Sequence, residues 1–172
     1  MSQNSGQPTG VNRIRNHIDN YGDPYITQLG PEETGVCSEC QSVYSGQRWY
    51  LKEQTEAHKL KNSSVHFTIC PACRKIRDNL PGGIVHMSGG FIGKHKDDIM
   101  NLIRNEGDRA KAVNPLERIM GIDGTDGNYD VTTTNEKLAQ RIGRALHKAY
   151  SGNVAYKWSE DNKLVRVSWQ RD

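Results

Sequence analysis

The chain has 172 residues, of which 34% are hydrophobic and 25% are charged, and its mean hydropathy is −0.79. These values allow one modest core and a small additional module, but they exclude a membrane span, since no run of about 18 apolar residues occurs. The formal net charge of +3 gives only weak support for a polyanionic partner. Because no apolar signal segment opens the sequence, we expect a cytoplasmic protein.

Residues 1–30 are rich in Ser, Asn, Gln, Gly and Pro and show little apolar periodicity. This composition is typical of a flexible N-terminal arm. The following region is more basic, since residues 37–80 carry seven basic and four acidic side chains.

The four cysteines fall into two Cys-x-x-Cys pairs, Cys37 with Cys40 and Cys70 with Cys73, separated by 29 residues. Two thiolates at this spacing can face the same ion, so two such pairs predict a tetrahedral site for one Zn²⁺. A shell closed by four sulfurs leaves no position for water or substrate, which favours a structural ion.

Other uses of these cysteines stay open. The same ligands can bind iron, and a disulfide framework or a thioredoxin-like redox pair would also use the Cys-x-x-Cys spacing. His58 and His66 are alternative ligands, although four cysteines already complete the shell.

Residues 31–80 are therefore predicted to form a zinc ribbon. Strand-forming residues on either side of Ser45-Gly46-Gln47 indicate a hairpin. A charged insertion follows from Lys52 to Lys61, with room for one helical turn, and Val65 to Ile69 reads as a strand that enters the second cysteine pair.

From residue 81 onward, strand and helix patterns alternate, and we expect an α+β domain over residues 81–172. Its first six elements match the βαββαβ order of the ferredoxin-like sandwich, in which two helices cover one face of an antiparallel sheet, and a last strand adds a hairpin. Turns are expected at 123–124 and 126–128, and Thr133 with Glu136 has capping-box spacing. The expected strands are Gly83–Met87, Leu116–Ile122, Tyr129–Thr133, Val154–Trp158 and Leu164–Trp169, and the expected helices are Lys96–Val113 and Asn135–Tyr150.

The second of these helices has a basic stripe. Four cations recur at intervals of four, three and four residues, which places them along one side of the helix: Lys137, Arg141, Arg144 and Lys148. Like charges at this spacing repel by roughly 0.2 to 0.5 kcal/mol per pair. The stripe suits the phosphates of a nucleic-acid backbone, or it is simply the solvated face of an amphipathic helix.

The ribbon supplies a second group of candidate RNA-binding residues. Aromatic rings can stack on unpaired bases while guanidinium and ammonium groups hold the backbone. Trp49 is equally suited to the core of a small module. The glycine-rich segment before the first helix lacks the Ser or Thr of a phosphate loop, but its lysines can still contact a phosphate. The candidates are Arg48, Trp49, Arg74, Lys75, Arg77, Lys94 and Lys96.

The segments CSECQSVYSGQRWY, CPACRKIRDNLPGG, GGFIGKHKDDIMNLIRNE, TTTNEKLAQRIGRALHKAYSG and LVRVSWQR resemble a family of small, largely uncharacterised bacterial zinc-ribbon proteins. The resemblance covers most of residues 23–171. More distantly, the cysteine pairs and the Ala-x-x-Ile-Gly helix are similar to the zinc-binding region of the archaeal and eukaryotic adaptor that accompanies the large ribosomal subunit during export. The resemblance implies that the four cysteines are metal ligands and that the partner is ribosomal or another RNA. Gln41 stands where many such ribbons have glycine.

These observations predict a zinc-binding, RNA-binding accessory factor associated with the ribosome, acting in translation or stress, with ribosomal proteins as further partners. No catalytic motif, small-molecule substrate or membrane partner is indicated. The alternatives are a ribbon that binds protein or acts in transcription, and a small metalloenzyme.

Overall fold

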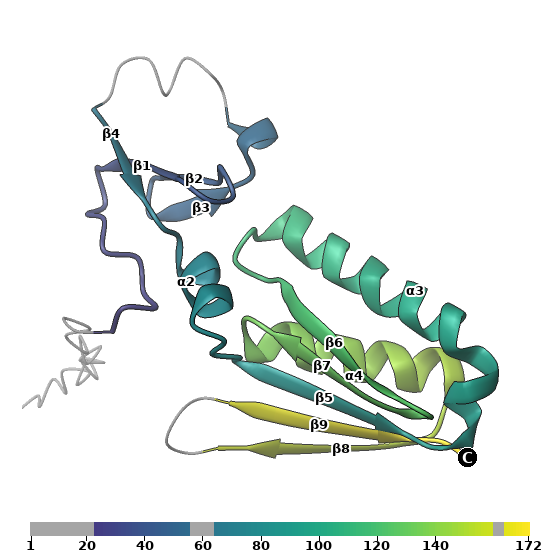
Figure 1. Ribbon diagram of the computed structural model, residues 1–172. Coiled ribbons are helices and arrows are strands. Elements are labelled where there is room, and N and C mark those ends of the chain that lie inside the picture. Colours follow the sequence, from purple (N-terminus) through teal and green to yellow (C-terminus); the bar gives the residue numbers. More distant parts are fainter. Residues whose placement is uncertain (1–22, 56–63, 160–163) are drawn as a thin grey trace, which may run out of the picture.

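The computed structural model describes residues 23–55, 64–159 and 164–172. Figure 1 shows a small sheet at one end of the molecule and a larger sheet with two helices on one of its faces. This is a mixed α+β architecture. The predicted N-terminal arm falls mainly on residues 1–22, which lie outside the described ranges, as does most of the charged insertion with His58.

The small sheet has the strand order β3-β2-β1-β4. Its elements are β1 (Thr34–Cys37), β2 (Val43–Ser45), β3 (Arg48–Tyr50), the 3₁₀ turn η1 (Lys52–Gln54) and β4 (Val65–Thr68), followed by α2 (Pro71–Arg77). The predicted hairpin is present, and its two loop residues, Gly46 and Gln47, both have positive φ angles, as a tight hairpin turn favours. β4 pairs with β1 in parallel and forms one edge of the sheet.

Part of the predicted arm belongs to this module. The side chain of Leu29 packs against the ribbon core, and Thr27 accepts a hydrogen bond of 2.8 Å from the indole of Trp49. The hydroxyl of Tyr25 also lies 3.1 Å from Asp78 Oδ2. Residues of the predicted arm therefore contact the ribbon, and Leu29 adds an apolar group to its small core.

The large sheet contains every strand predicted after residue 81, with small differences at the ends. Its elements, with the helices, are β5 (Gly83–Ser88), α3 (Gly90–Val113), β6 (Ile119–Thr125), β7 (Asn128–Thr133), α4 (Glu136–Tyr150), β8 (Asn153–Trp158) and β9 (Val165–Gln170). The turn between β6 and β7 lies at Asp126 and Gly127, both with positive φ, whereas the expected turn at 123–124 is part of β6.

The strand order β6-β7-β5-β9-β8 differs from the ferredoxin-like prediction. In the predicted order β8 would lie antiparallel beside β5. Instead β9 occupies that place, parallel to β5, and β8 is moved to the edge. The burial pattern explains the difference, since Val165, Val167 and Trp169 of β9 are fully buried, as a central strand requires.

Both long helices pack on the same face of this sheet (Figure 1) and enclose the main core with it. α4 begins with Asn135 as its N-cap, whose side chain accepts a hydrogen bond from the Leu138 amide. Thr133 instead bonds the backbone of Gly83 and Asn135, so the expected capping box is replaced by an Asn cap.

The glycine-rich segment forms the turn from β5 into the first residues of α3, and it lies against the C-terminal residues. Gly89 has a φ of 124°, and a Cβ there would lie 2.0 Å from the backbone oxygen of Arg171. The Arg171 guanidinium lies 3.7 Å from the centroid of the Phe91 ring. His95 has non-helical backbone angles, and the straight part of α3 begins after it, where the sequence predicts the helix to start.

Candidate metal centre

The fold brings the two cysteine pairs together between the two sheets. Cys37 ends β1 and Cys40 follows it, while Cys70 caps α2 and Cys73 lies in its first turn. All four Sγ atoms lie within 4.8 Å of one another, and Cys37 and Cys70 are fully buried. The four cysteines that the spacing singles out therefore form one cluster.

Local backbone geometry makes each cysteine pair turn tightly. Gln41 takes the left-handed conformation, with a φ of 63°, and its amide donates to the Cys37 carbonyl at 2.9 Å. A non-glycine residue thus fills the position where many ribbons have glycine. In the second pair, the Cys73 amide donates to Cys70 Sγ at 3.4 Å, and this fixes the direction of that sulfur.

The donor set fits a tetrahedral ion. Cys40 Sγ and Cys70 Sγ are 3.7 Å apart, which is much longer than a disulfide bond of about 2.05 Å. Four sulfurs at a Zn–S distance of about 2.3 Å would lie about 3.8 Å from one another. Soft thiolates in this arrangement suit zinc and also iron. The cluster can therefore hold one metal ion, with all four coordination positions taken by cysteine.

One residue of the larger module completes the surroundings of the sulfurs. Arg118, in the segment that leads into β6, donates to Cys40 Sγ at 3.0 Å and to Cys73 Sγ at 3.4 Å. Its Nε donates to the Pro115 carbonyl at 2.6 Å, and its backbone bonds Thr134. The guanidinium thus lies in a fixed orientation against the cysteine cluster.

The positive charge of Arg118 stabilises the deprotonated sulfurs, and the sulfurs stabilise the charged guanidinium. Hydrogen bonding with Cys70 and Cys73, and then with Ser42 and Arg118, holds the pKa of the Cys40 thiol well below its usual range. Burial opposes the charged form of Arg118, but its hydrogen bond to Cys40 and the charges of the sulfurs outweigh that effect and raise its pKa. A cation at this place also offsets the net negative charge of four thiolates around a divalent ion.

Sequence reasoning missed Arg118. It stands 45 positions from Cys73 in the chain, in a different module, and no spacing rule connects an arginine to a cysteine cluster at that distance. Four partly buried thiolates bring a large negative charge, and a nearby cation would stabilise it. This charge is the only signal in the sequence for a residue such as Arg118.

Three residues predicted to bind RNA donate hydrogen bonds to backbone carbonyls within the molecule. Arg48 donates to the Val113 carbonyl at 2.9 Å, at the C-terminal end of α3, and Lys75 donates to the Thr134 carbonyl at 3.0 Å. Arg74 donates to the Pro24 carbonyl at 2.7 Å. Helix ends and loops carry unpaired carbonyls that long cations can satisfy.

Two further members of the predicted ribbon surface are also engaged within the molecule. Arg77 Nε lies 3.1 Å from Asp78 Oδ1. Trp49 is only 4% exposed and packs beside Tyr44. Trp49 is therefore a core residue and is not available for base stacking, because a module this small needs its large aromatic side chains for its own core.

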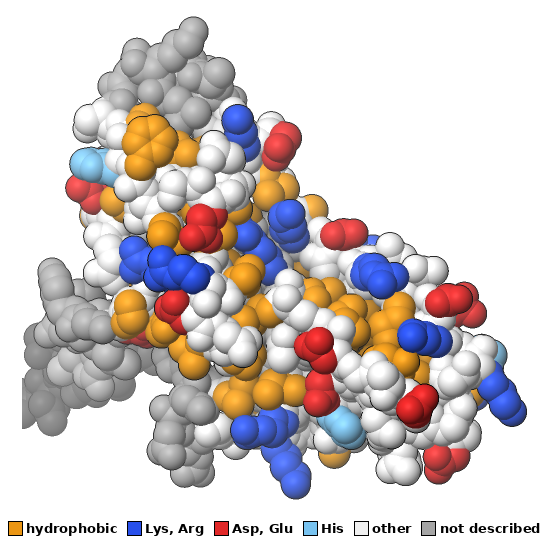
Figure 2. All heavy atoms as spheres, in the orientation of Figure 1, with side chains coloured by type: hydrophobic (Ala, Val, Ile, Leu, Met, Phe, Trp, Pro, Cys, Tyr) orange, Lys and Arg blue, Asp and Glu red, His pale blue; other side chains and the backbone are white. Residues whose placement is uncertain are grey.

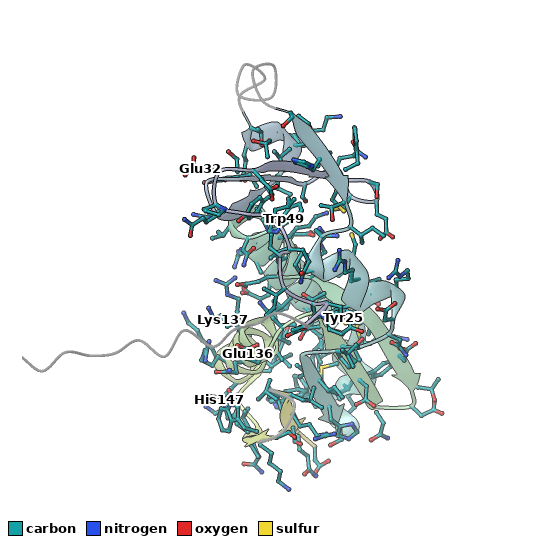
Figure 3. The ribbon with its side chains drawn as sticks, turned by 90° about the vertical axis from the view of Figure 1, so that its left-hand side faces the viewer. Tyr25, Glu32, Trp49, Glu136, Lys137 and His147 are labelled. Carbon is teal, nitrogen blue, oxygen red and sulfur yellow. The ribbon has the colours of Figure 1, made fainter. Side chains whose placement is uncertain are left out.

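The remaining candidates lie on the surface. Lys94 and Lys96 are exposed near the start of α3, with the Lys96 ammonium 5.2 Å from the centroid of the Tyr129 ring. On α4, Lys137, Arg144 and Lys148 are exposed. Figure 3 shows Lys137 and His147 along the outer side of this helix, well apart from Trp49.

One member of the α4 stripe differs from the others. Arg141 Nε lies 3.9 Å from Glu106 Oε2 on α3, and Glu106 also pairs with Arg109 at 2.9 Å. The repulsion expected along all four cations is therefore relieved at Arg141.

The fold and the cysteine cluster define a mixed α+β protein with a four-cysteine metal-binding module. No protein-family model, curated protein or solved structure matches the chain. In the described part of the chain, no helix combines the length and the apolar character needed to cross a membrane.

Proposed function

We propose that this protein is a metal-stabilised accessory factor that binds structured RNA through the outer face of α4, with ribosomal RNA as its partner. The observation that carries the proposal is the set of three exposed cations on that face. Lys137, Arg144 and Lys148 make no ion pair with an acid among the described residues.

The placement of these cations favours a binding role over a purely structural one. Lys137 lies in the first turn of α4, where the helix dipole disfavours positive charge by about 0.3 to 1 kcal/mol. An unpaired row of cations also repels itself. Phosphates of an RNA backbone would offset both unfavourable terms.

The two faces of the large sheet support this choice of surface. On the face away from the helices, Asp123 and Asp130 stand directly opposite each other on β6 and β7, and Asp130 Oδ1 lies 2.7 Å from the ring of His86. Paired aspartates repel phosphate at this edge of the face, although Lys157 and Arg166 stand opposite each other on β8 and β9 of the same face, so the α4 side is the surface to be tested against it. The spheres of Figure 2 show acidic and basic side chains interspersed over the face in view, without one dominant basic patch.

The metal centre contributes rigidity in this proposal. Four cysteine ligands leave no coordination position for a substrate, which favours a structural ion. Ribosomal RNA is proposed as the partner from the distant resemblance, expected from the sequence alone, of the cysteine pairs and the Ala-x-x-Ile-Gly helix to the zinc-binding region of the large-subunit export adaptor.

Titration of ribosomal RNA with the metal-loaded protein at several salt concentrations tests the proposal. Arg144→Gln combined with Lys148→Gln should weaken binding and reduce the log-log salt slope by roughly 1.4 to 1.8, at 0.7 to 0.9 per lost phosphate contact. Lys157→Gln combined with Arg166→Gln removes the same charge from the opposite face and is the matched control. Equal effects of the two double variants would contradict an α4 interface.

A specific observation favours protein docking as a second candidate function. Phe67 is 79% exposed on β4, at an edge of the described small sheet, and exposed edges can accept a strand from a partner. If Phe67→Ala abolishes co-sedimentation with ribosomes but leaves the binding of purified RNA unchanged, a ribosomal protein is the contact.

A further inference from the structure

The edge of the large sheet beside α4 carries a stacked pair of aromatic rings, of which Trp158 is exposed and Tyr156 is partly buried. The rings of Tyr156 and Trp158 on β8 have centroids 6.0 Å apart and an interplanar angle of 24°. Trp158 is 62% exposed. It is one of only two aromatic side chains that stand out as exposed large hydrophobic groups in the described residues, and the other, Phe67, lies on the ribbon.

The register of β8 places both rings on the helix side of the sheet. Tyr156 stands opposite Val167, and Trp158 stands opposite Val165, both of which are fully buried beneath α4. Directly opposed residues share one face of a sheet. Since β8 is the last strand of the sheet order, Trp158 projects at the rim, where α4 no longer covers the sheet completely.

One side of α4 lies against this rim of the sheet. A Cβ on Gly143 would lie 3.3 Å from the Tyr156 hydroxyl, so this part of the helix rests against β8. Gln140 and Arg144 border Gly143 on the helix surface, and Trp158 lies two residues beyond Tyr156, towards the first turn of α4. Figure 3 shows Glu136, Lys137 and His147 along that side of the helix.

We propose that Trp158, supported by Tyr156, is a stacking platform for an unpaired nucleobase of the RNA whose phosphates contact the α4 stripe. This inference rests on the proposed function and names the part of the RNA that the site recognises. An exposed indole at the β8 rim, on the side of the sheet that α4 covers, together with the unpaired cations of α4 matches the chemistry of an unpaired nucleotide, which presents an aromatic face and a negative backbone.

The opposite face of the sheet offers no comparable surface. Its described residues on the three central strands include no Phe, Tyr or Trp: they are Ile84, His86, Ser88, Asn128, Asp130, Thr132, Arg166, Ser168 and Gln170. Among the described residues of this sheet, the exposed indole therefore lies at the β8 rim and not on the open face.

An RNA hairpin with a single-stranded loop, and the same hairpin with abasic loop nucleotides, separate stacking from phosphate contact. The parent should bind the hairpin with bases about 5- to 150-fold more tightly, and Trp158→Ala should remove that preference without changing the salt slope. Trp158→Phe should keep part of the preference, since a smaller ring remains. Phe67→Ala, which removes an exposed ring elsewhere, is the matched control.

Fluorescence gives an independent readout within the same protein. The chain has three tryptophans, and Trp49 and Trp169 are buried. Quenching of the emission by the loop with bases, absent with the abasic loop and absent in Trp158→Phe, would support stacking on Trp158. This measurement also applies if the alanine variant folds poorly.

The outcomes distinguish the two proposals. If the parent binds both hairpins equally and Trp158→Phe changes nothing, the stacking platform is wrong and RNA binding by α4 stands. If the parent binds neither hairpin better than the Arg144 and Lys148 double variant does, both proposals are wrong. If Trp158→Ala converts a dimer into a monomer and leaves the loop preference intact, β8 is an interface between two copies and the inference is overturned.

Discussion

Nη2 of Arg118 lies 3.0 Å from Sγ of Cys40, although the two residues are 78 positions apart in the chain. One comes from the segment leading into the large sheet and the other from the ribbon. The metal centre is therefore also the junction between the two modules, and a change at Arg118 should be detected at the metal.

Arg118→Gln should weaken metal binding by about 10- to 100-fold, the usual effect of removing an outer hydrogen-bond partner of metal ligands. The lost cation leaves the thiolate charge less compensated. Competition with a chromophoric chelator measures the affinity. Arg48→Gln, which breaks a contact between the modules but touches no sulfur, should keep the parent affinity, and equal affinities for the parent and Arg118→Gln would refute a role at the metal.

Cys70→Ser should release the metal and unfold the ribbon, because it removes one of the four sulfurs that can hold the ion, while serine can still cap α2. The large sheet has a separate core, so most of the helix signal of α3 and α4 should remain. Metal analysis, circular dichroism and hydrogen exchange together test this. Loss of protection throughout α4 would show instead that the two modules unfold as one unit.

Gly143→Ala should destabilise the protein although alanine favours helices. The added Cβ would lie 2.6 Å from Cγ1 of the buried Val167, and overpacking of this kind costs about 1 to 3 kcal/mol. The gain in helix propensity is at most about 1 kcal/mol. Urea unfolding of the metal-loaded protein measures the balance. Gly93→Ala, where no atom lies within 4 Å of the added carbon, should be neutral or stabilising.

Arg141→Gln and Arg144→Gln should differ in their effects on stability. Arg141 pairs with Glu106, and a surface pair of this kind contributes about 0.2 to 1 kcal/mol. Arg144 has no such pair, and its removal should leave the free energy of unfolding unchanged or slightly higher. Double-mutant cycles with Glu106→Gln should give coupling for Arg141 and none for Arg144; the reverse would contradict the arrangement on α4.

Local patterns were sufficient for the cysteine cluster and for most elements. Cys-x-x-Cys spacing is a property of a few neighbouring residues, and the apolar residues of α4 recur at helical intervals. α2 was not predicted, although Pro71 after Cys70 is typical of a helix start. In so short a segment, the Cys-x-x-Cys spacing indicates a metal-binding turn more strongly than it indicates a helix.

The position of β9 and the role of Arg118 depend on contacts between distant parts of the chain. The alternation of Val165, Val167 and Trp169 indicates a strand with one buried face, but it does not identify the neighbouring strand. Likewise, the sequence around Trp49 does not tell whether its ring stacks on a base or fills a core. The core role is favoured only because the ribbon has few other large side chains.

The placement of β9 between β5 and β8 also gives the molecule a direction of assembly during synthesis. All four cysteines have been made once residue 73 is complete, whereas β5 has no partner on one side until residues 165–170 follow. The ribbon can thus close around an ion before the large sheet can form. Pairings over so many residues form slowly, and pulse-labelled hydrogen exchange during refolding should show ribbon amides protected before those of β5. The ion would then be captured before Arg118 joins it.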